Sequence, residues 1–366
     1  MNKTIRVLHT EWSGGWGGQE IRILNEMLSV RALGVEVFLA CRSDSILKQH
    51  VEQHHIPVFV LPFKGNADLK TLFSLKRIVK QNQIDIVNTH SGKDTWVGGF
   101  AAKLAGVKFI RTRHLSNRIK TTRINFINEL ADYIVTTGSS VRDDMIKYNR
   151  IRPEKIQSIP TGIDVELFNP DNYDKTKCRA LLSLAEDEVA IGIVAVLRRF
   201  KRHDLFLQMA QRLIAKYPEQ KLKFFIIGEG PQRDNIENII ANLNLSDNVN
   251  LSGHVDDVPA VLMALDIFVL SSDSCVGVPQ SVIQALFMNK KVVATDSGST
   301  KDLLHNDNFQ LVGAGSVDEL VAGVAHHLQS NAENNNQETP RETMIKNFSL
   351  TDMALRLLDI YRKIVE

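Results

Sequence analysis

Three observations predict that the chain folds as two α/β domains, each with a doubly wound parallel sheet. Its 366 residues exceed the size at which a single hydrophobic core stops growing. Short β-branched runs alternate with amphipathic segments of helical length, which is the pattern of βαβ units. A stretch rich in turn formers, residues 159–170, divides the runs into two sets. We therefore expect a first domain over 1–165, a second over 166–345, and a closing segment over 346–366.

Each predicted strand is a short run rich in valine and isoleucine, bounded by turn signals. The runs of the first domain are Ile5–His9, Val35–Ala40, Val58–Leu61, Ile84–Thr89, Lys108–Thr112 and Tyr133–Thr137. Those of the second are Glu188–Leu197, Leu222–Gly228, Val249–Leu251, Ile267–Leu270 and Lys291–Thr295. The closing segment includes an apolar helical stretch, Met353–Tyr361, which we expect to pack back toward the first domain.

Composition excludes several classes of protein. A net charge of +2 and a pI near 8.3 argue against a dedicated nucleic-acid binder. Three widely spaced cysteines, Cys41, Cys178 and Cys275, predict reduced thiols and neither a disulfide framework nor a metal site. The apolar run at the N-terminus is too short for a signal peptide or a membrane span, so we expect a cytoplasmic protein.

Open parallel sheets bind ligands at the carboxyl ends of their strands, and a glycine-rich turn follows the first predicted strand. This turn, Trp12–Ile23, contains Gly14, Gly15, Gly17 and Gly18. Glycines allow positive φ and a close approach of the backbone to a phosphate or sugar. The alternative is a tight turn under a packed helix. The pattern is neither the Gly-x-Gly-x-x-Gly dinucleotide fingerprint nor a Walker lysine motif.

A second turn of this kind follows the predicted strand Ile267–Leu270. The segment Asp273–Leu286 contains a Gly-x-Pro turn, and we expect a helix to begin near Pro279, since proline suits a first helical turn. Backbone N–H groups at such a helix start can hold a phosphate.

Further short motifs occupy the ends of other predicted strands. In chain order the whole set is Gly17–Glu20, Asn88–Ser91, Arg111–Leu115, Ile159–Asp164, Leu197–Lys201, Ile227–Pro231, Leu251–Val255, Gly277–Gln280 and Ala294–Ser299. In order and spacing, over nearly its whole length, the chain resembles retaining family-4 glycosyltransferases of the GT-B fold that build bacterial surface polysaccharide or lipopolysaccharide. The resemblance implies two Rossmann-like domains facing across a cleft, the first binding the acceptor and the second the nucleotide sugar.

Catalytic roles follow from the resemblance residue by residue. Lys201 matches the lysine that binds the donor diphosphate, where a fixed cation stabilises the charge on the leaving group. The family arginine of a Gly-Arg-Leu motif is absent, and Arg198 is the expected replacement. The alternative for both residues is a solvated basic turn. His114 matches the histidine that meets the transferred sugar.

The resemblance also implies a set of binding residues. Those on the donor side are Gly17, Gly18, Gly228, Gly230, His254, Val255, Val276, Gly277, Val278, Gln280 and Gln284, and those on the acceptor side are Trp16, Glu20, His90 and Arg113. A histidine at a strand end is also a common structural hydrogen-bond partner, which is the alternative for His90 and His114.

The chain departs from the family at two glutamates, which are replaced by Val276 and Gln284. Gln284 keeps an acceptor oxygen for the ribose, whereas Val276 has none for the sugar. A hydrogen bond to a charged group contributes about 1.5–3 kcal/mol, so the replacements are expected to weaken turnover. Asp273 is the expected source of a substitute carboxylate, and the backbone N–H groups of Gly277 and Val278 need no side chain.

One segment on the acceptor side is locally basic. It contains Arg111, Arg113, His114, Arg118, Lys120 and Arg123. Such a patch attracts a phosphorylated saccharide, a polyprenyl-phosphate carrier or an anionic membrane surface, and the alternative is a solvated loop and helix face. Trp12 and Trp16 are candidates for packing on sugar rings, while core packing is expected for Trp96.

These observations predict a metal-independent glycosyltransferase that needs no cofactor and uses a nucleotide sugar, UDP by resemblance, as co-substrate. Its acceptor is expected to be a saccharide or a lipid-linked sugar, with peripheral contact at the inner face of the membrane and no nucleic-acid partner. Two alternatives are a non-catalytic subunit that binds a nucleotide or saccharide, and a nucleotide-sugar epimerase or hydrolase.

Overall fold

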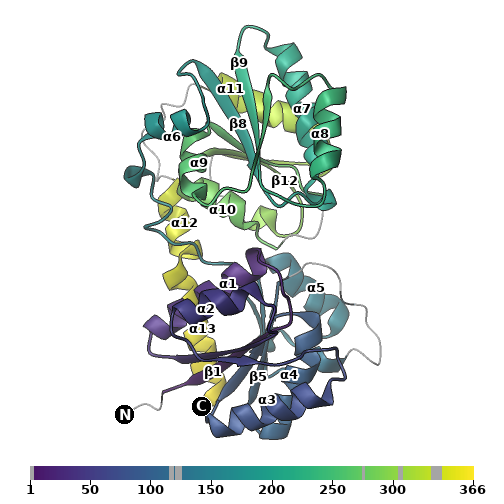
Figure 1. The fold of residues 1–366 in the computed structure, drawn as a ribbon, viewed down its shortest axis with the longest axis vertical. Helices are drawn as coiled ribbons and strands as arrows, with labels where there is room; N and C mark the ends of the chain where they lie inside the picture. The colour runs from purple at the N-terminus through teal and green to yellow at the C-terminus, as the bar shows by residue number, and fades with distance from the viewer. Residues whose placement is uncertain (1–3, 115–118, 120–125, 274–276, 304–307, 331–339) are drawn as a thin grey trace. The chain divides into compact units, whose positions relative to one another are not determined.

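The computed structural model of the chain describes residues 4–366, apart from 115–118, 120–125, 274–276, 304–307 and 331–339. The chain divides into two compact units (Figure 1). The first consists of Met1–Gly162 together with Leu350–Glu366, and the second of Ile163–Ser349.

The first unit is built on a seven-stranded sheet in the order β3-β2-β1-β4-β5-β6-β7, in which every pairing is parallel. The strands are β1 (Arg6–Glu11), β2 (Glu36–Cys41), β3 (Val58–Val60), β4 (Ile86–Thr89), β5 (Lys108–Arg113), β6 (Tyr133–Thr136) and β7 (Ile156–Ser158). The order reverses between β1 and β4, so their connections run to opposite faces of the sheet.

Helices cover both faces of this sheet (Figure 1). They are α1 (Gly18–Ala32), α2 (Ile46–Gln53), α3 (Leu69–Gln81), α4 (Gly92–Ala105), α5 (Ser139–Asn149) and the closing helix α13 (Leu350–Val365). Successive strand residues point to opposite faces, so Val7 packs in the layer of α1, α2 and α13, and Leu8 packs in the layer of α3, α4 and α5. The closing helix is therefore part of the core of the first unit, although the second unit precedes it in the chain.

The second unit repeats this architecture with a six-stranded parallel sheet in the order β10-β9-β8-β11-β12-β13. Its strands are β8 (Glu188–Val194), β9 (Lys221–Ile227), β10 (Val249–Gly253), β11 (Ile267–Leu270), β12 (Lys291–Thr295) and β13 (Phe309–Val312). Its helices are α6 (Lys175–Leu181), α7 (His203–Lys216), α8 (Arg233–Asn242), α9 (Val258–Ala264), α10 (Gln280–Phe287), α11 (Val317–Gln329) and α12 (Pro340–Phe348). Here the strand order reverses between β8 and β11.

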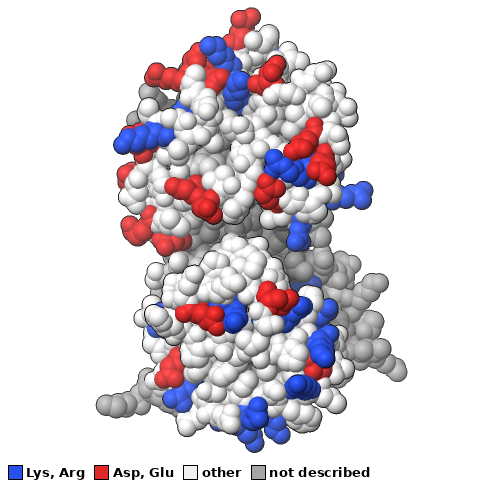
Figure 2. Space-filling model, viewed as in Figure 1, with Lys and Arg blue, Asp and Glu red and all other residues white. Residues whose placement is uncertain are grey.

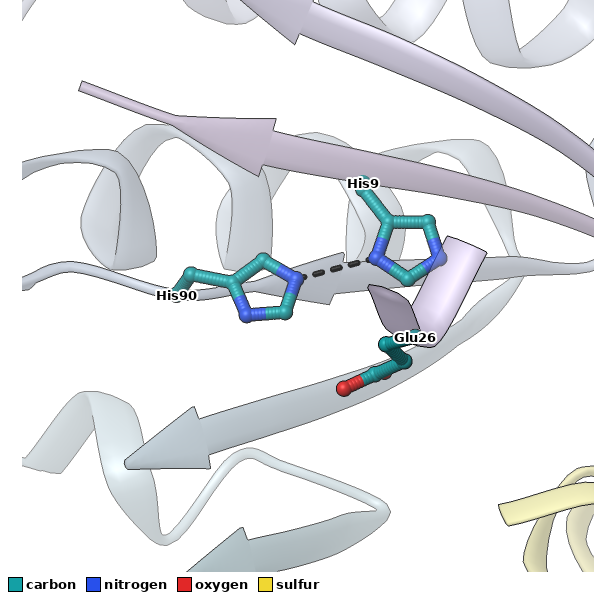
Figure 3. A group of neighbouring side chains, drawn as sticks. All are labelled: His9, Glu26 and His90. Carbon is teal, nitrogen blue, oxygen red and sulfur yellow. Dashed lines mark hydrogen bonds between the residues drawn. The ribbon is translucent and has the colours of Figure 1, made fainter. Parts of the chain in front are cut away.

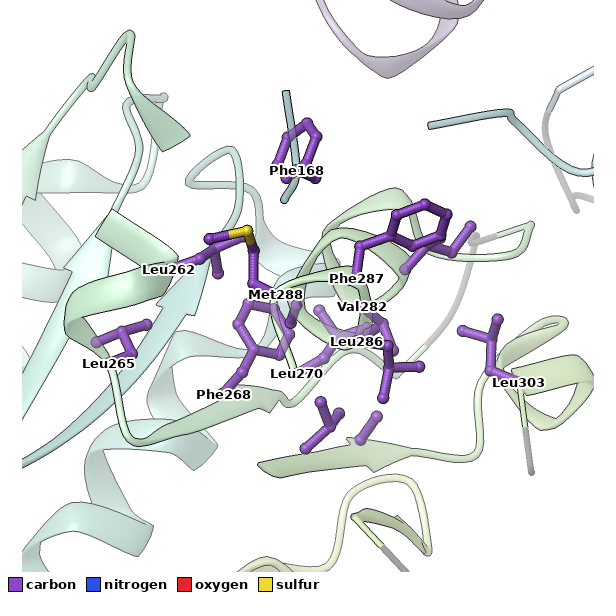
Figure 4. Close-up of a cluster of buried hydrophobic side chains, with 14 of the residues drawn as sticks. Phe168, Leu262, Leu265, Phe268, Leu270, Val282, Leu286, Phe287, Met288 and Leu303 are labelled. Atoms are coloured by element: carbon purple, nitrogen blue, oxygen red, sulfur yellow. The ribbon is translucent and has the colours of Figure 1, made fainter. Parts of the chain in front are cut away.

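Helix α10 is fixed on the second sheet by a buried apolar cluster (Figure 4). Val282, Leu286 and Phe287 on the helix belong to the same cluster as Phe268 and Leu270 on β11. All five side chains are at most 1% exposed. Burying a large apolar side chain stabilises a fold by about 1.5–3 kcal/mol, so this contact holds the start of α10 near the end of β11.

The predicted class, two doubly wound parallel α/β sheets, is confirmed. Two edge strands, β7 and β13, were not predicted from the sequence. They contain three and four residues, and β7 lies close to the turn-rich stretch that begins at Ile159. Short edge strands pair on one side only, so a weak β pattern suffices to form them.

Charged side chains of both signs are interspersed on the face of the molecule shown in Figure 2. This distribution agrees with the small net charge of +2.

Candidate functional site

The carboxyl ends of β1 and β4 meet at the reversal point of the first sheet, where doubly wound folds bind ligands. His9 pairs in register with Asn88, and Thr10 pairs with Thr89. His90 follows directly after β4, and His114 follows β5 in the same way. The sheet thus brings three histidines to one edge.

These histidines form a hydrogen-bonded chain. Nδ1 of His9 lies 2.9 Å from Nε2 of His90, and Nδ1 of His90 lies 3.0 Å from Nε2 of His114. His9 and His90 are buried with rings stacked at 5.2 Å between centroids, whereas His114 is half-buried. Figure 3 shows the first of these bonds and the carboxylate of Glu26 beside it.

Burial governs the ionisation of all three rings. It lowers the pKa of His9 to about 3 and holds the pKa of His90 well below its ordinary value, with further lowering of the latter by His9 and His114. Burial also holds the pKa of His114 well below its ordinary value, and the Arg22 and Arg111 guanidinium groups add to the effect. The three imidazoles are therefore neutral at neutral pH.

A buried ion pair on α1 faces the histidines. Nε of Arg22 lies 3.7 Å from Oε2 of Glu26, and both side chains are fully buried. Oε1 of Glu26 accepts hydrogen bonds from Nδ2 of Asn88 at 2.9 Å and from the hydroxyl of Tyr361 at 3.2 Å. Nη1 of Arg22 donates to Oγ1 of Thr161 at 3.3 Å. Strand β4, helix α1 and the closing helix α13 are thereby joined through the buried side chains of Asn88, Arg22, Glu26 and Tyr361.

Three side chains of this region have the composition of a metal site. His9, Glu26 and His90 place ligand atoms within 4.8 Å of one another. The guanidinium of Arg22 beside Glu26 opposes a second cation at the same place, because like charges repel strongly where water is excluded. The hydrogen bond between His9 and His90 also occupies the ring nitrogens that face each other. We therefore assign the group to hydrogen bonding.

Two buried carboxyl groups lie on the other side of the β1 terminus. Burial, followed by the charge of Asp94, raises the pKa of Glu11 to about 8. Asp94 accepts hydrogen bonds from the backbone N–H groups of His90 and Ser91, at 3.0 and 2.8 Å, and from Oγ1 of Thr10 at 2.6 Å. Burial raises the pKa of Asp94 as well, but the Arg111 guanidinium and these hydrogen bonds oppose that rise, so we assign the proton of the pair to Glu11.

Glu11 also holds the glycine-rich turn in place. Its Oε1 accepts from the backbone N–H of Ser13 at 2.6 Å, and its Oε2 lies 2.5 Å from Nε2 of Gln19. None of the glycines from Gly14 to Gly18 adopts a positive φ. A Cβ at Gly17 would meet only Oε2 of Glu20, at 3.6 Å. Gly17 thus leaves open space beside an extended backbone.

The other predicted acceptor-side residues surround this turn. Glu20 is buried on the first turn of α1, and Trp16 stacks on His50 with 3.9 Å between ring centroids. Trp12 lies under Nζ of Lys93, 3.8 Å from the ring centroid. Trp96 packs against the core with Phe100 and Phe126, as expected.

The predicted basic patch needs a correction at Arg111. This side chain is buried and donates to the backbone oxygen of Ser91 at 2.8 Å, so it does not contribute to a surface patch. A guanidinium donates up to five hydrogen bonds, and here it satisfies backbone oxygens around the start of α4. Arg113 is half-buried, and burial lowers its pKa. Arg118, Lys120 and Arg123 lie outside the described residues.

In the second unit, Lys201 lies on a 3-10 turn (Arg199–Lys201) that follows β8. Oγ of Ser271, at the end of β11, donates to the backbone oxygens of Lys201 and Arg202, at 2.9 Å each. The lysine is therefore held at the reversal point of the sheet. It is half-buried, and burial lowers its pKa to about 8.

Two glycines after β9 are required by the backbone. Gly228 has φ of +141°, and a Cβ there would lie 2.0 Å from the backbone oxygen of Ala195. Gly230 has φ of +157°, and a Cβ would lie 2.7 Å from the oxygen of Leu197. The N–H of Gly228 donates to the oxygen of Gly253 at 2.8 Å. The loops that follow β8, β9 and β10 are thus held together by backbone contacts.

His254 and Val255 follow the third of these loops. His254 is exposed and lies 3.1 Å from Asp256, between Nε2 and Oδ1, while Val255 is partly buried and packs against the core. Both remain beside the glycine loop that the resemblance assigns to the nucleotide.

Helix α10 begins at Gln280, with Pro279 as the residue that precedes its first turn. Val278 is buried, whereas Gly277, Gln280 and Gln284 are half-buried. Val276 lies outside the described residues.

Asp273 forms an ion pair with Arg202, with 3.2 Å between Oδ2 and Nη1. We expected this carboxylate to substitute for a family glutamate, and in the structure it is paired with Arg202.

Arg198 lines a polar cavity of about 400 Å³ in the second unit. The cavity is bordered by Arg198, Arg199, Arg202, His203, Asp204, Gln232, Asn235, Ile236 and Asp273. Lys201 does not line it, although the two residues share one turn, in which the N–H of Lys201 donates to the oxygen of Arg198 at 2.9 Å.

Sequence reasoning missed His9, Glu11, Arg22, Glu26 and Asp94. One signal was available. Arg22 and Glu26 stand at an i, i+4 spacing directly beside Ile23 and Met27, which mark the apolar face of α1. Charges at the border of an apolar face indicate a buried ion pair or a functional site.

Two family models match the chain in succession. Glycosyltransferase Family 4 matches residues 16–167, and Glycosyl transferases group 1 matches residues 188–330. The chain is 24% identical over 375 residues to the UDP-Gal:alpha-D-GlcNAc-diphosphoundecaprenol alpha-1,3-galactosyltransferase of Escherichia coli, covering 98% of this chain and 96% of the relative.

Solved structures share the fold of this chain over nearly its whole length. The glycosyltransferase of Rickettsia africae ESF-5 superposes with a TM-score of 0.89 at 20% identity, covering 99% of both chains. Anabaena Alr3699/HepE, solved in complex with UDP, has a TM-score of 0.85 at 18% identity, covering 98% of this chain and all of the other. Among the described residues, no helix has the length and apolar character that a membrane crossing requires. The chain belongs to the GT-B glycosyltransferases that join a family 4 domain to a group 1 domain.

Proposed function

We propose that the chain transfers a sugar from a uridine diphosphate sugar to a saccharide or lipid-linked acceptor, with retention of configuration. The observation that carries this proposal is the half-buried Lys201, held by Ser271 at the reversal point of the second sheet. A departing diphosphate develops negative charge, and a fixed, partly desolvated cation stabilises that charge more than water does. Arg198 on the same turn is the second proposed cation.

The relatives support the identity of the two substrates. The E. coli relative is named for a UDP-Gal donor and a diphosphoundecaprenol-linked acceptor, and the Anabaena structure was solved with UDP. A lipid-linked acceptor would bring the protein to a membrane surface, which is the basis for proposing a cytoplasmic enzyme with peripheral contact at the inner face. Arg113 is a partly exposed basic residue on the acceptor side that fits such a contact.

The backbone of the second unit suits a nucleotide. Gly228 and Gly230 let the loop after β9 pack directly on the backbone of the loop after β8, and the N–H of Gly228 donates to the oxygen of Gly253, next to His254. The start of α10 follows Gly277 and Val278, whose N–H groups we propose as donors to the diphosphate. Gln284, four residues into that helix, is the proposed partner of the ribose. On the acceptor side we place Trp16, Glu20 and Arg113, whereas the buried His90 contacts His114 and not the acceptor.

We propose that the acceptor hydroxyl attacks the sugar from the side of the leaving group. The bond between the anomeric carbon and the diphosphate oxygen breaks, a bond to the acceptor oxygen forms, and the departing phosphate takes the hydroxyl proton. The charge that this step places on the diphosphate is met by Lys201, Arg198 and backbone N–H groups. We propose that the step needs neither a metal ion nor a cofactor.

Thermal unfolding against uridine, guanosine and adenosine diphosphates and their sugar conjugates tests the donor site. A ligand at one hundred times its Kd stabilises the folded state by about 2.7 kcal/mol, so the midpoint should rise clearly for the uridine series. Lys201→Ala should remove most of this rise and leave the unliganded midpoint unchanged. Transfer with the selected donor should persist in EDTA. A rise of equal size in Lys201→Ala would contradict the assigned role.

A non-catalytic binding protein is the second candidate, because Val276 and Gln284 replace two carboxylates. Val276→Glu distinguishes the two functions. If the chain is an active transferase, this variant should turn over faster, or at least as fast. If neither protein transfers sugar although both bind UDP, the binding function is favoured. Incubation of the donor without acceptor reveals an epimerase or hydrolase directly.

A further inference from the structure

The chain of three histidines in the first unit runs from the core to a partly exposed edge. His9 and His90 are 0% and 1% exposed, and the half-buried His114 forms the outer end. Two bonds between ring nitrogens, of 2.9 and 3.0 Å, join the three rings. Each bond needs one N–H donor and one bare nitrogen.

The number of ring protons limits the possible arrangements. A neutral imidazole carries one N–H and one bare nitrogen, so three neutral rings carry three N–H protons. Two of these protons occupy the two bonds between rings. The third therefore lies at one end of the chain, on Nε2 of His9 or on Nδ1 of His114.

The two ends are not equivalent. Nε2 of His9 is buried and has no hydrogen-bond partner among the described residues. A proton there would be a buried donor without an acceptor, which folded proteins rarely tolerate. His114 is half-buried and its Nε2 faces His90, so Nδ1 is the nitrogen left for solvent or a ligand. The third proton therefore belongs on Nδ1 of His114.

We propose that His9 and His90 are positioning residues that hold His114 in its Nδ1–H tautomer, so that His114 donates a hydrogen bond to an oxygen of the saccharide substrate. This role rests on the proposed sugar transfer. His114 then acts as a fixed donor and not as a base, because its bare nitrogen is occupied by the N–H of His90. A hydroxyl that accepts this bond must direct its own proton elsewhere, which orients the substrate.

Nuclear magnetic resonance of the protein with 15N-labelled histidine tests the tautomers without any substrate. Two-bond correlations between ring carbon-bound protons and ring nitrogens distinguish a protonated nitrogen from a bare one. Each ring is assigned from the signals that disappear in a single His→Gln variant. We expect N–H on Nδ1 and a bare Nε2 in His9, His90 and His114. An Nε2–H tautomer at His114 would overturn the proposal, whether or not the protein transfers sugar.

Two substitutions of His90 separate positioning from packing. Asparagine places its amide near the Nδ1 position and can still donate to His114, whereas glutamine reaches the Nε2 position and contacts only His9. His90→Asn should keep kcat/KM within about threefold of the wild type, and His90→Gln should lose about tenfold, as for the loss of one substrate hydrogen bond. His54→Gln, at an exposed position, should leave kcat/KM unchanged. Equal losses in both His90 variants would show a structural role.

Zinc titration tests the competing assignment of His9, Glu26 and His90. If one equivalent of zinc raises the unfolding midpoint, and His9→Gln abolishes the rise, the group holds a metal ion and the proposed proton arrangement is wrong. If zinc has no effect, the hydrogen-bonded arrangement is supported.

Discussion

The pKa of Lys201 gives the reaction a pH dependence that an ordinary lysine would not. Burial lowers this pKa to about 8, so the side chain is about nine-tenths charged at pH 7 and about one-tenth charged at pH 9. Only the protonated form attracts a diphosphate. In the part of the chain that the structure describes, no carboxylate forms an ion pair with Lys201 that would restore its ordinary pKa. We therefore expect donor capture to fall about tenfold between pH 7 and pH 9.

The two kinetic constants should respond differently. The pH profile of kcat/KM reports ionisations of the free enzyme, whereas that of kcat reports those of the enzyme with its substrate bound. A bound diphosphate favours the charged lysine and raises its pKa. The fall in kcat/KM should thus have its midpoint near pH 8, and the fall in kcat should have its midpoint at a higher pH. Initial rates over pH 6.5 to 10, with the donor concentration varied at each pH, give both profiles.

Lys201→Arg is the matched variant for this experiment. An arginine stays charged throughout the range, so its normalised kcat/KM profile should be flat where that of the wild type falls, even if its absolute rate is lower. A wild-type profile that stays level to pH 10 would refute the lowered pKa. A fall of equal size in Lys201→Arg would show that another group titrates.

Two further predictions concern folding. Gly228→Ala should lower the free energy of unfolding in urea by about 3 kcal/mol or more, because φ of +141° and a Cβ 2.0 Å from the oxygen of Ala195 leave no space for a side chain. Gly65→Ala is the control, because a Cβ at Gly65 would lie in open space. Equally small losses of stability in the two variants would contradict the argument. Glu11 has a folded pKa of about 8, above its ordinary value, so its contribution to stability is complete below the ordinary value and is lost as the pH rises through 8. The unfolding free energy of Glu11→Gln relative to the wild type should therefore increase by about 3 kcal/mol from pH 5.5 to pH 9, and parallel curves would show that Glu11 is ionised throughout.

The fold was predictable because its signals are local. Each βαβ unit reveals itself within some thirty residues by β-branched runs, amphipathic helices and turn formers. The candidate residues after strands, such as Lys201 and His114, were predictable for the same reason, because parallel strands end at one edge of a sheet. The edge strands β7 and β13 were missed because each contains a single β-branched residue, in Ile-Gln-Ser and Phe-Gln-Leu-Val, whereas the equally short β3 reads Val-Phe-Val.

The buried polar group could not be predicted in this way, because its contacts are not local. His9 and His90 are 81 residues apart in the sequence, and Tyr361 reaches Glu26 across 335 residues. In the sequence each of these side chains looks like an exception to an apolar pattern. Only the strand register, which sets His9 beside Asn88, turns these exceptions into a network.

The energetics of that network bear on its role. A buried ion pair such as Arg22 and Glu26 adds little stability over apolar residues of the same volume, because its desolvation offsets the Coulomb attraction. Nε and Nη2 of Arg22, Nε2 of His9 and Oε2 of Glu26 are buried atoms without a hydrogen-bond partner among the described residues. An unsatisfied buried polar atom costs about 1–3 kcal/mol. This group therefore stabilises the fold poorly. It lies at the reversal point of the sheet and leads outward to His114. Orientation of a ligand explains its presence better than stability does.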